Sequence, residues 1–211
     1  MDPNRMTQKS QEALHDAQTK ALRFGHTEVD GEHLLLALLD QPEGLAPRLL
    51  EQAGADPRRL RTDVEDELSR RPRVSGPGAA PGQVFVTQRL SRLLDAADRE
   101  ARRLKDEYVS VEHLLLALIE EGSTTASGRV MHGQGLSRDR FLEALTSVRG
   151  NQRVTSAMPE VAYEALEKVW ARPGRRRSGG QARSGDRPRR GDPAGDPDPV
   201  PQDQEQPGAD R

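Results

Sequence analysis

The side chains with the clearest potential for chemistry are two glutamate–histidine pairs, Glu32-His33 and Glu112-His113. Each pair begins a leucine-rich run, and the two runs, EHLLLALL and EHLLLALI, differ at one position. A helical zinc site needs a second histidine four residues after the first, but alanine stands at both of those positions. The spacing therefore predicts no metal site, and we expect both histidines to be buried structural residues.

Other kinds of catalytic or cofactor site find no support in the sequence. A phosphate-binding loop for a nucleotide would require a Gly-Lys pair, and the chain contains none. The absence of cysteine excludes a thiol nucleophile and thiolate metal ligands. Glu32 and Glu112 are tens of residues apart, with no nucleophile nearby in sequence. We therefore predict that the chain is not an enzyme, and that it has no catalytic residue and no cofactor.

The elements that position the two pairs form an internal repeat with an offset of 80 residues, which is the distance from Glu32 to Glu112. The register extends beyond the leucine runs, since Thr7-Gln8 matches Thr87-Gln88 and Val29 matches Val109. A unit of this length is too long for a solenoid repeat and fits a small helical subdomain.

Apolar periodicity, N-capping residues and terminal glycines predict four helices in each repeat. In the first repeat we expect helices over residues 7–24, 32–39, 46–52 and 56–69, and in the second over 87–104, from 110 through the second leucine run, 126–132 and 137–148. The helix at 126–132 is the weakest prediction, because glycines in and around it lower helix propensity. A further short helix is expected over residues 159–169.

Composition sets the fold class and the domain organisation. With 33% hydrophobic but only 3% aromatic residues, the core must consist of Leu, Val and Ala, which favours helices. We predict an all-α domain, a tandem pseudo-twofold repeat of two four-helix units in which the leucine-rich helices are central. The predicted boundaries are 1–71 for the first repeat, 72–85 for a linker, 86–150 for the second repeat, 151–169 for a linker with a short helix, and 170–211 for a disordered tail.

Charge and hydropathy give little information about partners. The net charge is −2, so the chain as a whole is not a polycation for nucleic acid. No stretch approaches the length of a membrane span, and the N-terminus lacks an apolar run, so we expect a cytoplasmic protein that does not bind membranes. The tail contains Arg175-Arg176-Arg177, but it also contains several aspartates and, after Trp170, no aromatic residue. Nucleic-acid binding by the tail is therefore a third-ranked alternative.

Several segments together resemble a known family. They are Val29-Asp30-Gly31-Glu32-His33 with its leucine run, Tyr108 to His113, and Val148-Arg149-Gly150-Asn151-Gln152-Arg153-Val154. These segments closely resemble the Clp repeat N-terminal domain, and most closely that of ClpB-type AAA+ disaggregase chaperones. The resemblance extends from Met1 to about Lys168.

The resemblance implies a function in binding. In this family the domain is a mobile module that receives unfolded or aggregated polypeptides for an ATP-driven ring and, in the ClpC branch, adaptor proteins and phosphorylated arginine. The family's contact positions fall here on Thr7, Asp106 and Glu112, and the repeat adds Glu32 and Thr87. A carboxylate can hold a guanidinium and an N-cap hydroxyl can hold phosphate. The structural alternative is that the threonines only cap helices and the glutamates only interact with helix dipoles.

The family continues into an ATPase domain, whereas the residues after Val169 do not resemble one. Read from the second base of each codon, permitted codons for Trp170 to Arg211 give a sequence similar to the family's lead-in to its first phosphate-binding loop. We therefore hypothesise that a frameshift near Val169 produced the tail. Without the ring we expect a monomer. A second-ranked alternative is a stand-alone adaptor that regulates a Clp chaperone or protease.

Overall fold

The structure, a computed structural model, describes residues 3–41, 44–73, 84–150 and 152–159. The central part of the predicted linker between the repeats, most of the helix predicted at 159–169, and the tail predicted to be disordered from residue 170 lie outside these residues. Within the described part of the chain, no helix is long and apolar enough to cross a membrane.

The described residues form an all-α fold in which each repeat contributes four helices, as the sequence predicted. In chain order the elements are η1 (Pro3–Arg5), α1 (Gln8–Phe24), β1 (Glu28–Val29), α2 (Gly31–Leu39), α3 (Leu45–Gln52), α4 (Pro57–Ser69), β2 (Phe85–Val86), α5 (Gln88–Arg103), α6 (Val111–Glu120), η2 (Gly122–Thr124), α7 (Ala126–Gly133) and α8 (Arg138–Arg149). Each helix lies within a few residues of the predicted range.

The predicted capping residues explain where the helices begin and end. The hydroxyl oxygen of Thr7 accepts a hydrogen bond from the amide of Ser10 at the start of α1, and Thr87 does the same at the start of α5. These bonds satisfy amides that have no partner inside the helix. Gly25 ends α1 in the left-handed conformation, with φ of 73°. This conformation is accessible to glycine without a steric penalty.

The helix predicted least firmly, α7, does form, and one of its glycines is required there. A Cβ atom on Gly128 would lie 1.8 Å from the carbonyl oxygen of Gly122, in the preceding η2 turn. The close approach of these two backbone segments therefore requires glycine at position 128, even though glycine lowers helix propensity.

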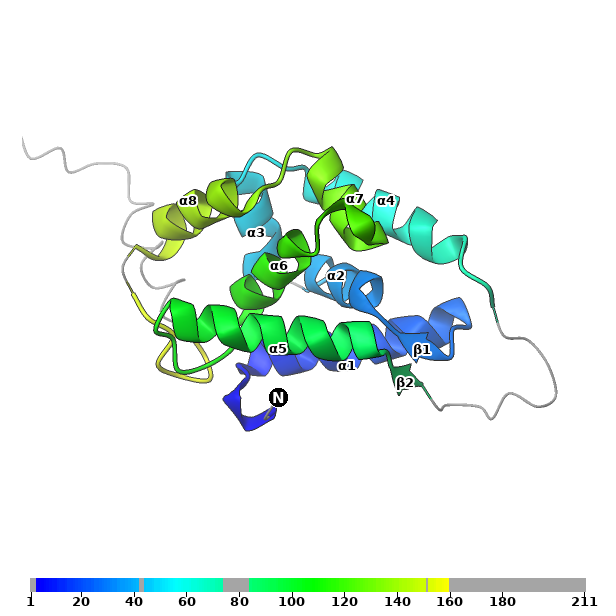
Figure 1. Ribbon diagram of the computed structural model, residues 1–211, viewed down its shortest axis with the longest axis horizontal. Coiled ribbons are helices and arrows are strands. Elements are labelled where there is room, and N and C mark those ends of the chain that lie inside the picture. Colours follow the sequence, from blue (N-terminus) through cyan, green and yellow to red (C-terminus); the bar gives the residue numbers. More distant parts are fainter. Residues whose placement is uncertain (1–2, 42–43, 74–83, 151, 160–211) are drawn as a thin grey trace, which may run out of the picture. The chain divides into compact units, whose positions relative to one another are not determined.

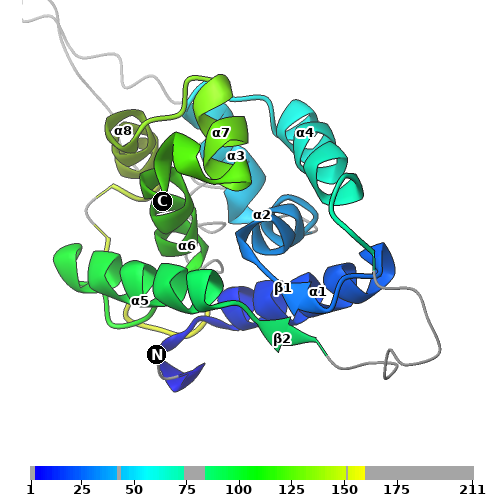
Figure 2. The same cartoon turned by 45° about the vertical axis from the view of Figure 1, so that its right-hand side comes forward.

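The helices are arranged in three layers (Figures 1 and 2). The pair α1 and α5 lies on one side, α2 and α6 occupy the middle, and the remaining helices α3, α4, α7 and α8 lie on the other side. Every residue of α2 is buried, as is every residue of α6 from Val111 to Ile119. This central position explains why both helices are apolar on all sides rather than amphipathic.

The two repeats exchange short extended segments. β1 of the first repeat pairs in parallel with β2 of the second, with Val29 opposite Val86. The reciprocal contact is a parallel bridge between Met6 and Val109. Because Met6 corresponds to Val86 and Val29 to Val109 at the 80-residue offset, the two contacts are related by the pseudo-twofold symmetry.

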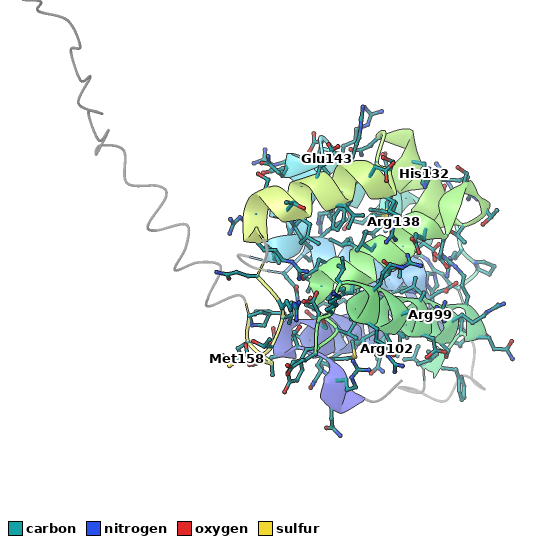
Figure 3. The ribbon with its side chains drawn as sticks, turned by 60° about the vertical axis from the view of Figure 1, so that its left-hand side comes forward. Arg99, Arg102, His132, Arg138, Glu143 and Met158 are labelled. Carbon is teal, nitrogen blue, oxygen red and sulfur yellow. The ribbon has the colours of Figure 1, made fainter. Side chains whose placement is uncertain are left out.

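The shorter helices also pack across the repeat boundary. α3 packs against α6 and α8, and α7 packs against α2 and α4. Within the second repeat, Arg138 on α8 (labelled in Figure 3) forms ion pairs with Glu100 on α5 and Glu120 on α6. The repeats are therefore interlocked, and neither could keep its native contacts without the other.

Candidate functional site

The exchange of extended segments places each N-cap threonine beside the glutamate-bearing helix of the other repeat. The amide of Thr87 donates to the carbonyl of Val29 at 3.1 Å, just before α2, which carries Glu32. The amide of Thr7 donates to the carbonyl of Val109 at 3.0 Å, just before α6, which carries Glu112. The structure thus pairs Thr87 with the Glu32 region and Thr7 with the Glu112 region.

Glu32 is fully buried, and both of its carboxylate oxygens are occupied. Arg89 donates to them at 2.9 and 3.0 Å, and Arg71 donates to Oε2 at 2.5 Å. The backbone amide of Ser127 adds a hydrogen bond of 3.0 Å. Together with Asp30, Thr87 and Glu121, these residues form what we call the first-repeat cluster.

Arg89 connects the first-repeat cluster across the molecule. Its other nitrogens donate to Glu121 at 2.9 and 2.7 Å, and Nη1 also lies 3.1 Å from Asp30. Burial alone would raise the pKa of Glu32, but the charges of Arg89 and Arg71 outweigh this effect and hold that pKa below its ordinary value. Glu32 therefore stays ionised in an ion-pair network that joins the two repeats.

Thr87 also belongs to this network. Its hydroxyl donates to Asp30 Oδ1 at 2.9 Å while its oxygen accepts from the amide of Leu90 at 3.0 Å. Burial would raise the pKa of Asp30, but Arg89, the Gly31 amide and the Thr87 hydroxyl together lower it. Thr87 thus caps a helix and also donates a hydrogen bond to an ionised carboxylate.

The second-repeat cluster consists of Asp106, Glu112, His113 and Arg149. Arg149 donates to Glu112 Oε1 at 3.1 Å and lies 2.8 Å from Asp106 Oδ2. Asp106 also accepts from His113 at 2.9 Å and from the amide of Val154 at 2.8 Å. Burial would raise the pKa of Asp106, but these three partners hold it below the ordinary range. The cluster therefore brings Asp106 and Glu112 together around one guanidinium.

Glu112 differs from Glu32 in having an unused acceptor. Its Oε2 is buried and has no hydrogen-bond partner among the described residues. Leaving a buried acceptor without a partner costs free energy. Thr7 is fully buried and its hydroxyl lies 3.0 Å from Ser10 Oγ. The second-repeat cluster therefore retains acceptor capacity that the first-repeat cluster has used.

His33 and His113 cap the N-terminal ends of the glutamate-bearing helices. The Nδ1 atom of His33 accepts from the amide of Asp30, and that of His113 accepts from the amide of Ser110, each at 3.0 Å. The proton of each neutral ring must then be on Nε2, which donates to His26 in the first repeat and to Asp106 in the second. No group of three or more His, Asp or Glu side chains within the described residues could hold a metal ion.

Sequence reasoning found the carboxylates and the threonines but missed the arginines that neutralise them. Arg71 is 39 positions after Glu32, and Arg149 is 37 positions after Glu112. Arg89 stands two residues after the cap Thr87, but the corresponding Lys9 forms an ion pair with Glu12 on its own helix. No local pattern therefore marks the arginines, and only the folded structure shows that Glu32 and Glu112 already hold guanidinium groups.

Comparisons with known proteins identify relatives of this chain. The Clp repeat (R) N-terminal domain family matches residues 5–132. Chaperone protein ClpB of Nitratidesulfovibrio vulgaris is 55% identical over 168 residues, or 80% of this chain and 19% of that protein. The Bacillus cereus ClpB is 46% identical over 169 residues, with the same shares. The chain thus spans about a fifth of the length of these relatives.

A solved structure confirms the fold. The Hsp104 N-terminal domain from Candida albicans superposes with a TM-score of 0.61 at 22% identity, covering 72% of this chain and 96% of that domain. The family match includes both glutamate-bearing helices and both N-cap threonines. This chain belongs to the Clp repeat N-terminal domain family.

Proposed function

We propose that this chain is a non-catalytic binding module that recognises unfolded or aggregated polypeptides, or an adaptor protein, for a Clp-type disaggregase or unfoldase. The observation that carries this proposal is the family match over residues 5–132. The 55% identity to a ClpB chaperone over 80% of the chain supports the disaggregase branch.

Within the molecule, we assign the recognition of a charged group first to the second-repeat cluster. Glu112 Oε2 lacks a partner among the described residues, so it can accept a hydrogen bond from a guanidinium without losing an existing one, once the residues that cover this buried oxygen move aside. Asp106 and Thr7 complete this site in the proposal. A phosphorylated arginine is the ligand that matches this chemistry, because it presents a guanidinium and a phosphate together.

The first-repeat cluster would bind such a ligand only by exchange. A guanidinium that reaches Glu32 must displace Arg71, whose side chain is 30% exposed, whereas Arg89 is 22% exposed and also anchored by Glu121. Next to Thr87, Phe85 and Val86 are 64% and 48% exposed, and they offer apolar contact to an unfolded polypeptide. In this proposal Glu32 and Thr87 form the second, weaker recognition point.

The test is to titrate the full chain with a fluorescent, permanently unfolded polypeptide and to compete with free phosphoarginine. We expect binding in the wild type. Glu112→Gln keeps the shape of the side chain but removes its charge, so we expect it to weaken competition by about tenfold or more. Glu32→Gln should weaken competition less.

Glu107→Gln is the matched control, because Glu107 is exposed and lies close to Glu112 in sequence. It should leave both binding and competition unchanged. Thermal melts of each variant separate a lost contact from a lost fold. A wild-type chain that binds neither the unfolded polypeptide nor phosphoarginine would refute the proposal.

A further inference from the structure

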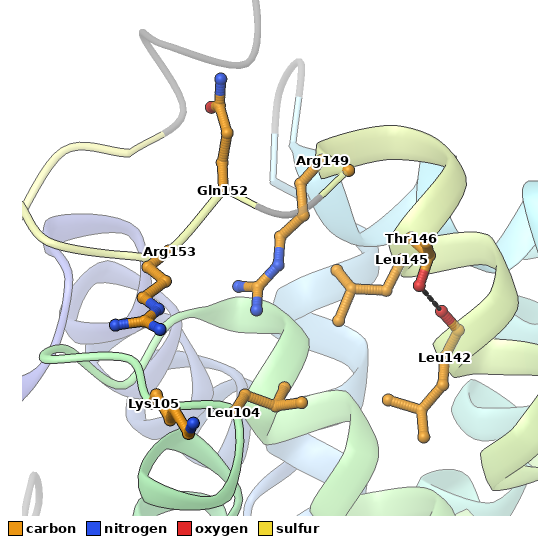
Figure 4. A pocket seen from close by; sticks show the side chains of 9 residues that line it. Leu104, Lys105, Leu142, Leu145, Thr146, Arg149, Gln152 and Arg153 are labelled. Carbon is orange, nitrogen blue, oxygen red and sulfur yellow. Dashed lines mark hydrogen bonds between the residues drawn. The ribbon is translucent and has the colours of Figure 1, made fainter.

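A pocket of about 330 Å³ lies where the C-terminal ends of α5 and α8 meet the chain that leaves the domain (Figure 4). Leu104, Leu142 and Leu145 line one side of it. The guanidinium groups of Arg149 and Arg153 and the ammonium group of Lys105 gather on the other side. A pocket of this size, with an apolar wall and a few charged groups, has the properties of a ligand site.

The pocket has an excess of positive charge. No acidic residue lines it. Arg149 is neutralised from outside by Glu112 and Asp106. Lys105 and Arg153 are exposed, and neither forms an ion pair within the described residues. Two cationic side chains thus face a partly apolar pocket without a counter-charge.

The first repeat contains a pocket in a partly equivalent position, and there carboxylates oppose most of the cations. That pocket, of about 260 Å³, is lined by Phe24, Arg61 and Glu65. They correspond to Leu104, Leu142 and Thr146, because the N-caps Asp56 and Ser137 give α4 and α8 an offset of 81 residues. Of its three cations, Lys20 and Arg61 pair with Asp40, and Glu65 lines the pocket beside them, while Arg23 is the third. The pocket of the second repeat is lined by no such carboxylate, so its excess of positive charge is larger.

The backbone at Lys105 gives an independent reason to regard its side chain as functional. Lys105 has φ of 61°, and it is the one non-glycine residue with positive φ among the described residues. The corresponding residue in the first repeat is Gly25, with φ of 73°. Glycine adopts this conformation without strain and lysine does not. The second repeat thus keeps a strained lysine where the first has glycine, and this lysine lines the pocket.

We propose that this pocket binds an acidic peptide segment in which an aspartate or glutamate stands next to a leucine-like residue. The carboxylate pairs with Lys105 and Arg153, and the apolar side chain packs on Leu104, Leu142 and Leu145. The volume accommodates one or two side chains, so recognition is local and does not require a folded partner.

This proposal extends the proposed function, because it gives a bound polypeptide a second contact of different chemistry. The two ideas remain separable. The site at Glu112 is selective for a cationic guanidinium, whereas this pocket is selective for an anion. The acidic peptide can therefore bind even if phosphoarginine does not, and the reverse also holds.

The test uses the full chain and short rhodamine-labelled peptides with the cores Asp-Leu-Asp, Asn-Leu-Asn and Asp-Gly-Asp, followed by fluorescence anisotropy. We expect the first peptide to bind at least about tenfold more tightly than either of the others, because it satisfies both halves of the pocket. Its affinity should fall as the salt concentration rises from about 0.05 to 0.3 M, since the cations are exposed.

The double variant Lys105→Asn, Arg153→Gln should lose this binding by about tenfold or more. Asparagine tolerates the left-handed conformation, so the fold is kept. The control Arg58→Gln, Arg99→Gln removes two exposed cations outside the pocket and should bind like the wild type (Arg99 is labelled in Figure 3). Equal losses in both double variants would show attraction to net charge alone and would overturn the proposal, as would equal binding of all three peptides.

Discussion

The imidazole rings of His26 and His33 meet edge to face in the interior of the first repeat, with His26 Nδ1 2.8 Å from His33 Nε2. At the 80-residue offset His26 corresponds to Asp106, which accepts from His113. One repeat therefore pairs its buried histidine with a carboxylate and the other with a second histidine. Burial, followed by Arg71 and His26, lowers the pKa of His33 to about 4, and burial with Arg71 and Arg73 also lowers that of His26.

This pair predicts a loss of stability in mild acid. Between pH 6.5 and about 4, the unfolded chain binds protons at these histidines and the folded chain does not, so the free energy of unfolding falls as the pH falls. For His33 the loss amounts to at most about 3 kcal/mol by pH 4. Urea unfolding of the full chain at a series of pH values measures it.

Two variants identify the source of that loss. His26→Asp copies the pair of the second repeat, and its carboxylate would stabilise a protonated His33, so the loss between pH 6.5 and 4 should become smaller. His15→Gln removes an exposed histidine and should leave the pH profile unchanged. A His26→Asp profile as steep as that of the wild type would contradict the assignment.

The ion-pair network around Glu32 predicts a large effect at Arg89. Arg89→Gln leaves Glu32, Asp30 and Glu121 without their shared guanidinium in a largely buried site. Removing one partner of such a network costs about 3–5 kcal/mol. Arg89→Lys should restore only part of this, since an ammonium cannot hold two carboxylates bidentately. Arg92→Gln, an exposed neighbour on the same helix, should change the unfolding midpoint very little.

The two glycines of α7 should respond in opposite ways to alanine. Gly128→Ala places a Cβ atom against the carbonyl of Gly122. Because the backbone fixes the positions of both atoms, the change should cost about 3 kcal/mol. A Cβ on Gly133 meets no atom within 4 Å, so Gly133→Ala should raise stability by up to about 1 kcal/mol through helix propensity. Thermal unfolding of the two variants compares them directly, and similar melting temperatures would refute the close approach.

The extent to which sequence predicted this molecule follows from the range of each interaction. Helix termini depend on residues a few positions apart, so Thr7, Thr87 and Gly25 could be read directly from the sequence. The burial of α2 and α6 followed from their apolar runs. The partners of Glu32 come from distant segments, with Arg89 57 positions away and the Ser127 amide 95. These pairings depend on how the repeats interlock, which no local pattern encodes.

The left-handed backbone at Lys105 leads to a last prediction, in which stability and binding change in opposite directions. Lysine in this conformation costs about 1–2 kcal/mol relative to ordinary helical backbone. Glycine adopts the conformation without strain, and it lowers stability mainly because its unfolded state has more conformational entropy. Lys105→Gly should therefore raise the free energy of unfolding by up to about 1 kcal/mol and weaken binding of the Asp-Leu-Asp peptide. Gly25→Ala is the converse change in the first repeat. A Cβ there would lie 3.6 Å from Arg73 Cβ, an ordinary contact, so its expected cost of about 1 kcal/mol comes from the backbone conformation. Urea unfolding and peptide anisotropy on the same samples check both effects. A Lys105→Gly variant that is less stable than the wild type would show that the lysine stabilises the fold, and would remove the argument that its strain is retained for binding.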